Sequence, residues 1–136
     1  MIEKILNSNK LLTEIYFDLQ KYFETKYPNP IVLIEIGSFF EIYEANGIGK
    51  AKEIAEFLNI QLTRKNKSII EITDRNPLMA GFPNHAIERY LSKLVDEEKY
   101  TIIIVKQKGM PPNVTRYVSD IISAGVNFEY AKSSEN

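Results

Sequence analysis

Cysteine is absent from this chain of 136 residues. Its absence excludes disulfide bonds, thiolate catalysis and cysteine-ligated metal sites. Histidine is nearly absent, because His85 is the only one. It stands at the expected start of a helix, so we interpret it as a surface or capping residue, and catalysis would need a partner group.

Excess charge and long apolar runs are also missing. The formal net charge is −1, whereas a stand-alone DNA-binding domain is usually clearly basic. Either DNA is not the partner, or other parts of a larger protein supply most of the positive charge. No apolar run approaches the length of a membrane-spanning helix, and the first ten residues show no signal-peptide pattern. We therefore expect a cytoplasmic protein.

What the chain does contain is an alternation of helical and strand patterns. Helices are expected at residues 10–27, 48–58 and 85–98, the last with Asn84 as its N-cap. Strands are expected at 30–37, 39–44, 60–63, 77–83, 100–107 and 114–122. Residues 64–76 are expected to form a loop, or a loop with a short strand at 69–72. This order predicts an α/β fold with a central mixed β-sheet flanked by helices.

The predicted helices and strands divide the chain into three parts. Residues 1–10 are expected to be an N-terminal extension and residues 11–122 a single domain. Residues 123–136 are small and polar, which is typical of a fraying tail or the start of a linker.

No pattern in the sequence indicates catalysis. Carboxylates are spread along polar helix faces, and neither a nucleophile elbow nor metal-ligand spacing occurs. The stretch "GIGKAKE" lacks the remainder of a phosphate-binding loop. We therefore expect a binding domain with no cofactor and no metal of its own.

Positive charge gathers in two places. One is Arg64-Lys65 with Lys67, and the other comprises Lys106, Lys108 and Arg116. Solvated surface lysines are the simpler interpretation of these residues taken alone. Contacts to phosphates that flank a binding face are the alternative.

The stretch "GSFFEIY" (37–43) places a carboxylate directly behind two phenylalanines. In a strand, Phe39 and Glu41 point to one face, and Phe40 and Ile42 point to the other. Without further information, two core phenylalanines and a rim charge would be the commoner arrangement.

Four blocks of sequence together resemble one family. They are "IVLIEIGSFFEIYEA", "LNIQLTRK", "PLMAGFPNHAIERYLSKLVDEEKYTIIIVKQKG" and "NVTRYVS". In this order and spacing they are similar to the N-terminal mismatch-recognition domain of the MutS DNA mismatch-repair proteins. The most specific element is Phe39-x-Glu41 behind Gly37. Ser38 departs from the family, which more often has an acid at this position.

The resemblance implies a function and a set of residues. In the family, the phenylalanine of this motif enters the minor groove and stacks on a mispaired base, and the glutamate hydrogen-bonds to that base. These positions correspond to Phe39 and Glu41, and Arg64, Lys65 and Lys108 are expected to contact DNA phosphates.

The resemblance also implies partners. They are double-stranded DNA with mismatches or small loops, and the further domains of a longer, dimeric ATPase that uses ATP and Mg²⁺. The alternative is a divergent domain that serves as a structural or protein-interaction module.

Overall fold

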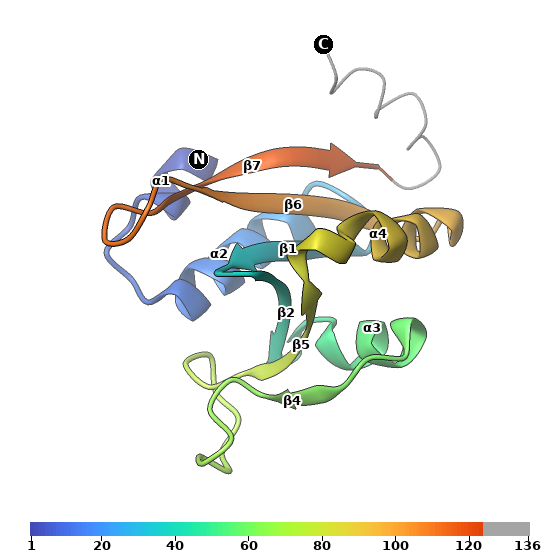
Figure 1. The fold of residues 1–136 in the computed structure, drawn as a ribbon, viewed down its shortest axis with the longest axis horizontal. Helices are drawn as coiled ribbons and strands as arrows, with labels where there is room; N and C mark the ends of the chain where they lie inside the picture. The colour runs from blue at the N-terminus through green and yellow to red at the C-terminus, as the bar shows by residue number, and fades with distance from the viewer. Residues whose placement is uncertain (124–136) are drawn as a thin grey trace.

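Figure 1 shows the computed structural model, which describes residues 1–123. The helices are α1 (Ile2–Leu6), α2 (Leu12–Glu24), α3 (Ala51–Leu58), the short 3-10 turn η1 (Asn84–Ala86) and α4 (Ile87–Asp96). The strands are β1 (Pro30–Ile36), β2 (Phe39–Ala45), β3 (Ile48–Gly49), β4 (Leu62–Arg64), β5 (Leu78–Pro83), β6 (Thr101–Lys108) and β7 (Thr115–Ile122).

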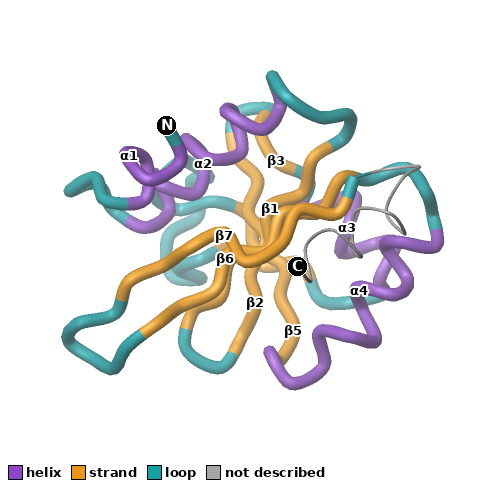
Figure 2. Tube along the Cα trace, turned by 90° about the horizontal axis from the view of Figure 1, so that it is seen from above, coloured by secondary structure: helices purple, strands orange, loops and turns teal. Residues whose placement is uncertain are grey.

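The strands form one mixed sheet in the order β4-β5-β2-β1-β6-β7, with β3 paired to β2 outside this path. Strands β1 and β6 are parallel, and the other neighbours are antiparallel. Helices α1 and α2 lie on one side of the sheet, and α3 and α4 lie on the other (Figure 2). The predicted α/β fold with a mixed sheet between helices is therefore confirmed.

The sheet bends sharply between β1 and β2. These strands pair only next to their turn, over three residue pairs from Ile34↔Glu41 to Ile36↔Phe39. Beyond this point β2 curves away and continues beside β5, as Figure 1 shows. The bend leaves the first half of β1 with one edge that β2 does not cover.

Helix α2 covers that open edge with side chains. The Tyr16 hydroxyl donates to the Val32 carbonyl at 2.7 Å. The Gln20 amide donates to the Pro30 carbonyl at 2.8 Å and accepts from the Val32 N–H at 3.3 Å. Buried backbone groups require such partners, so α2 replaces the missing part of the β1–β2 ladder.

Two hydrophobic cores fill the two faces of the sheet. The core under α3 and α4 includes Leu33, Phe40, Ile42, Ile54, Phe82, Leu94 and Ile104. The core under α2 includes Tyr16, Leu19, Phe23, Val32, Ile34, Tyr43 and Val105. Because both faces of β1 and β6 are covered, these strands are continuous apolar runs, as the sequence pattern indicated.

The remaining sequence predictions differ from the structure in detail. Helix α1 and strand β3 were not predicted, and residues 69–72 form no strand. The expected tail from 123 lies, apart from Ser123, outside the described residues.

Asn84 begins η1, but its side chain forms no cap hydrogen bond there. The Asn84 side-chain amide instead donates to Glu35 Oε2 at 3.1 Å. The prediction of Asn84 as an N-cap was therefore wrong.

Candidate nucleic-acid interface

The β1–β2 turn carries Phe39 at its base. Ile36 pairs with Phe39, so only Gly37 and Ser38 form the turn. Gly37 has a φ of +59°, a left-handed conformation that glycine adopts without steric cost. Such a two-residue turn follows the right-handed twist of the flanking strands and starts β2 directly at Phe39.

The side chains at the start of β2 alternate between solvent and core. Phe39 is 45% exposed, whereas Phe40 is 2% exposed and Ile42 is fully buried. The Phe40 ring packs against Phe82 with a centroid distance of 6.0 Å. Phe39 and Glu41 share the opposite face, so the predicted division of this strand between core and surface is confirmed.

Phe39 and Glu41 border a shallow depression of about 320 Å³ on that face. The other residues that line it are Gln61, Thr63, Lys67, Met79 and Gly81. Gly81 is directly opposite Glu41. A Cβ at Gly81 would lie 2.9 Å from the Phe40 carbonyl oxygen and 3.5 Å from Glu41 Cγ. Glycine at this position therefore keeps the space beside the Glu41 side chain open.

Two donors hold one carboxylate oxygen of Glu41. Lys65 Nζ lies 2.8 Å from Oε1, and the Tyr43 hydroxyl donates to the same oxygen. The Glu41 side chain is only 14% exposed. Burial, followed by the nearby negative charge of Glu41, raises the pKa of Tyr43 well above its ordinary value. Tyr43 is therefore a neutral hydroxyl donor at physiological pH.

A polar cluster fixes the turn from the side of β6. The Gln107 amide donates to the Gly37 carbonyl and accepts from the Gly37 N–H. The Asn84 N–H donates to the Ser38 carbonyl at 2.7 Å. Glu35 joins the two, because its carboxylate accepts from the Asn84 amide and from the Gln107 N–H at 3.0 Å. The turn that carries Phe39 is thus bonded on both sides.

Sequence reasoning missed this cluster. Glu35 and Gln107 are 72 positions apart in the chain, and no local motif connects them. The only available signal was the placement of polar side chains at the ends of two strands that were otherwise apolar. A parallel β1–β6 pairing, inferred in advance, would have brought them together.

The predicted basic residues lie in different surroundings. Lys65 is bonded to Glu41, which lines the depression, whereas Lys67 lines the depression itself. Arg64 instead donates to the Ile69 and Lys67 carbonyls, both at 2.8 Å, and so holds the loop that follows β4. Lys108 is exposed at the end of β6, next to Gln107. The structure therefore brings Phe39, Glu41 and Lys65 together and leaves Arg64 with the loop backbone.

Arg116, on β7, contacts the end of β1 just before the β1–β2 turn. Its Nε donates to the Glu35 carbonyl at 2.9 Å. Burial lowers its pKa, and the nearby Tyr43, Glu35 and Glu41 partly offset this effect. Arg116 thus places a half-buried positive charge next to the acidic residues behind the turn.

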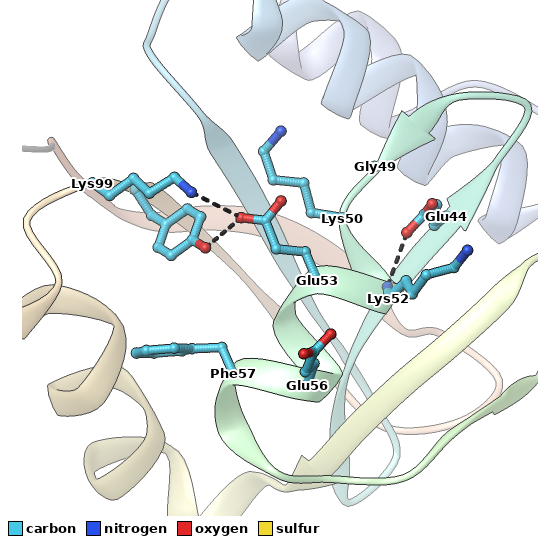
Figure 3. Close-up of a pocket in the computed structure, with 9 residues that line it drawn as sticks. Glu44, Gly49, Lys50, Lys52, Glu53, Glu56, Phe57 and Lys99 are labelled. Atoms are coloured by element: carbon cyan, nitrogen blue, oxygen red, sulfur yellow. Dashed lines mark hydrogen bonds and ion pairs between the residues drawn. The ribbon is translucent and has the colours of Figure 1, made fainter.

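A larger cavity, of about 620 Å³, is lined by the end of β2, by α3 and by the segment before β6 (Figure 3). Two of its carboxylates are bonded to protein donors. Lys99 and the Tyr100 hydroxyl both donate to Glu53, and Glu44 accepts from the Lys52 N–H at 2.9 Å. The Glu44 carboxylate thus accepts a hydrogen bond in the first turn of α3, the place at which a helix N-terminus would bind an anion.

Residues 1–123 were also searched for metal-binding clusters and for membrane-spanning helices. No cluster of histidine and acidic side chains that could hold a metal ion occurs in this part of the chain. Within the same residues, no helix combines the length and apolar character needed to cross a membrane.

Comparisons with known proteins identify the family of this chain. The family described as MutS domain I matches residues 16–131. DNA mismatch repair protein MutS of Chlorobium limicola is 34% identical over 116 residues, which are 81% of this chain and 12% of that protein. The MutS protein of Lactococcus lactis subsp. cremoris is 31% identical over 125 residues, 87% of this chain and 14% of the relative.

A third relative, MutS of Leuconostoc citreum, is 36% identical over 115 residues, 77% of this chain and 12% of its own length. The chain therefore spans only about an eighth of the curated relatives that it matches.

Proposed function

This chain belongs to the MutS domain I family, and from that premise we propose that it recognises mismatches in double-stranded DNA. Phe39 inserts from the minor groove at a mispaired or bulged base, and Glu41 accepts a hydrogen bond from that base. The domain works within a longer, dimeric cytoplasmic protein whose other parts bind ATP and Mg²⁺. In this proposal the present chain is a binding domain and catalyses no reaction itself.

One observation supports the proposal most directly. Phe39 is a large apolar ring that is 45% exposed, and it stands on a turn that is hydrogen-bonded on both sides. An exposed ring on a flexible loop would lose conformational freedom on insertion, which weakens binding. A ring on a fixed turn loses little, so more of the stacking energy is available for recognition.

The energetics favour lesions over paired bases. Unstacking a base step costs a few kcal/mol, and the cost is lower where pairing is already weakened. Stacking of the base on an aromatic ring returns about 1–3 kcal/mol and tolerates any base. A single phenylalanine can therefore serve many mismatches, and the ease of deforming the DNA provides the discrimination.

Glu41 adds a second filter. A carboxylate near phosphates is repelled, so it disfavours undistorted duplex. A hydrogen bond from a mispaired base to the charged oxygen offsets that repulsion only at the lesion. The two side chains thus act together, one by stacking and the other by penalising the wrong partner.

The test compares the 136-residue chain with its Phe39→Ala variant. Binding to a G·T duplex and to the matched G·C duplex is measured by fluorescence anisotropy at low ionic strength. We expect the wild type to prefer the G·T duplex. The variant should lose about 1–3 kcal/mol of affinity for it and bind the matched duplex as before.

Phe57→Ala is the matched control. Phe57 is 37% exposed, but it lies on α3 across the sheet from Phe39, at the large cavity. Its removal should change neither affinity. A folded Phe39→Ala protein that still prefers G·T would contradict the proposal and favour a structural or protein-interaction module instead.

A further inference from the structure

We propose that Lys65 is a positioning residue for Glu41 and not a simple phosphate contact. Together with Tyr43 it holds one oxygen of Glu41, so that the other oxygen is presented to the depression beside Phe39 as a hydrogen-bond acceptor for the mispaired base. This inference rests on the function proposed above. It identifies a residue that sets the specificity of the domain for mispaired bases by orienting Glu41.

Geometry places Lys65 at Glu41 rather than in solvent. Its ammonium lies 2.8 Å from Glu41 Oε1 and 5.4 Å from the centroid of the Tyr43 ring. Only 33% of the Lys65 side chain is exposed. Tyr43 itself is fully buried. The lysine stem thus covers a buried ring while its charge is bound to the carboxylate.

The backbone at Lys65 is also fixed. Its N–H donates to the Pro77 carbonyl at 2.9 Å, which extends the β4–β5 ladder beyond Arg64. The loop after it is closed by buried Asn76, whose side chain bonds to the backbone of Asn66, Ile69 and Glu71. Lys65 is therefore anchored on a rigid element, which is what a positioning residue requires.

The arrangement leaves one acceptor of Glu41 available. Both protein donors converge on Oε1, and within residues 1–123 the structure records none on Oε2. Gly81, opposite Glu41, leaves open space on this side. An ionised carboxylate accepts through both oxygens, so a base that enters beside Phe39 meets an acceptor whose direction is already set.

The charge of Lys65 has a second effect. A carboxylate that is 14% exposed and lacks a counter-charge is costly, because a buried charge needs a partner. Lys65 supplies this partner and reduces the repulsion that Glu41 exerts on nearby phosphates. Loss of Lys65 should weaken binding to both duplexes through the lost charge. It should weaken binding to mismatched DNA more, because only the mispaired base uses the Glu41 acceptor whose orientation is then lost.

A double-mutant cycle on the 136-residue chain tests this coupling. Affinities for G·T and G·C duplexes are measured over a salt series for wild type, Lys65→Met, Glu41→Gln and the double variant. We expect Lys65→Met to reduce the preference for G·T by at least about threefold, as found for residues in direct contact. In the Glu41→Gln background, Lys65→Met should not change the preference further.

Three variants serve as controls. Lys67→Met removes an equal charge from the lining of the depression beside Glu41, and it should weaken both duplexes equally and reduce the salt slope by about one. Lys65→Arg keeps the charge and should retain the preference. Tyr43→Phe removes the other donor and should lower the preference in the same direction, which keeps the test decisive if Lys65→Met folds poorly.

Failure of the inference is distinguishable from failure of the proposed function. If Phe39→Ala removes the G·T preference but Lys65→Met weakens both duplexes equally, with the salt slope reduced by about one, Lys65 is a phosphate contact and only the inference is overturned. If wild type binds both duplexes with equal affinity, the proposed function fails, and the inference fails with it.

Discussion

Neighbouring phenylalanines in β2 have opposite roles, which a stability measurement can separate. Phe40 is 2% exposed and packs on Phe82, whereas Phe39 is 45% exposed. Replacing a buried phenylalanine with alanine typically costs about 3–5 kcal/mol. We therefore expect Phe40→Ala to lower the free energy of unfolding by about this amount, measured by urea denaturation.

Phe39→Ala is the paired variant, and it should lower the same free energy by clearly less, about 1–2 kcal/mol, because 45% of the Phe39 surface is exposed. Equal losses in the two variants would show that Phe39 belongs to the core. In that case its loss of mismatch affinity could not be attributed to stacking.

Among the elements, the β1–β2 turn and the end of β6 act as one unit. Gln107 bonds both backbone groups of Gly37. Gln107→Leu keeps a side chain of similar size but removes both bonds. We expect the Gly37 amide to exchange with solvent faster, as measured by hydrogen exchange with NMR, and G·T affinity to fall because Phe39 is held less firmly.

Lys108→Ala, at the adjacent residue of β6, is the control for this exchange measurement. Lys108 is exposed, and the bonds to Gly37 come from Gln107, so the exchange rate of Gly37 should not change. Unchanged exchange in Gln107→Leu would mean that the β1–β2 pairing alone holds the turn.

Local features of this region could be predicted from the sequence, whereas long-range contacts could not. Strand β2 and its alternation were predictable, because the period of two and the Gly37 turn are local. The bonds from Gln107 and Lys65 to the site were not, since they depend on the parallel β1–β6 pairing and on the loop that follows β4. The sequence indicated Lys65 only as a basic residue, and its partner came from the fold.

The same limit explains Asn84. Its position before a helical pattern is typical of an N-cap, and no local feature argued against that interpretation. The pairing of Pro83 with Phe39, however, brings the end of β5 next to the β1–β2 turn, so the Asn84 side chain bonds to Glu35 instead. Tertiary contacts overrode the local preference.

For the molecule as a whole, both cores place tyrosine hydroxyls at positions where ionisation is unfavourable. Burial is the main cause that raises the pKa of Tyr16, Tyr43 and Tyr100 above the ordinary value of 10.0. Tyr16 bonds across to β1, Tyr43 bonds to Glu41, and Tyr100 bonds to Glu53. The Tyr16 and Tyr100 hydroxyls thus connect α2 and α3 to the sheet, and the Tyr43 hydroxyl holds the Glu41 side chain of the candidate site.

A raised pKa in the folded state means that folding favours the protonated form. The resulting stability is fully present below the unfolded value near 10.0 and is lost as the pH rises toward the folded value. We therefore expect the free energy of unfolding to fall above pH 10, with the last part of the tyrosinate absorbance appearing only as the near-UV circular dichroism is lost. Tyr43→Phe should reduce this dependence because one of the three groups is gone. Tyrosinate absorbance that reached its full amplitude while the near-UV signal stayed intact would show that these hydroxyls ionise in the folded protein, contrary to the burial described here.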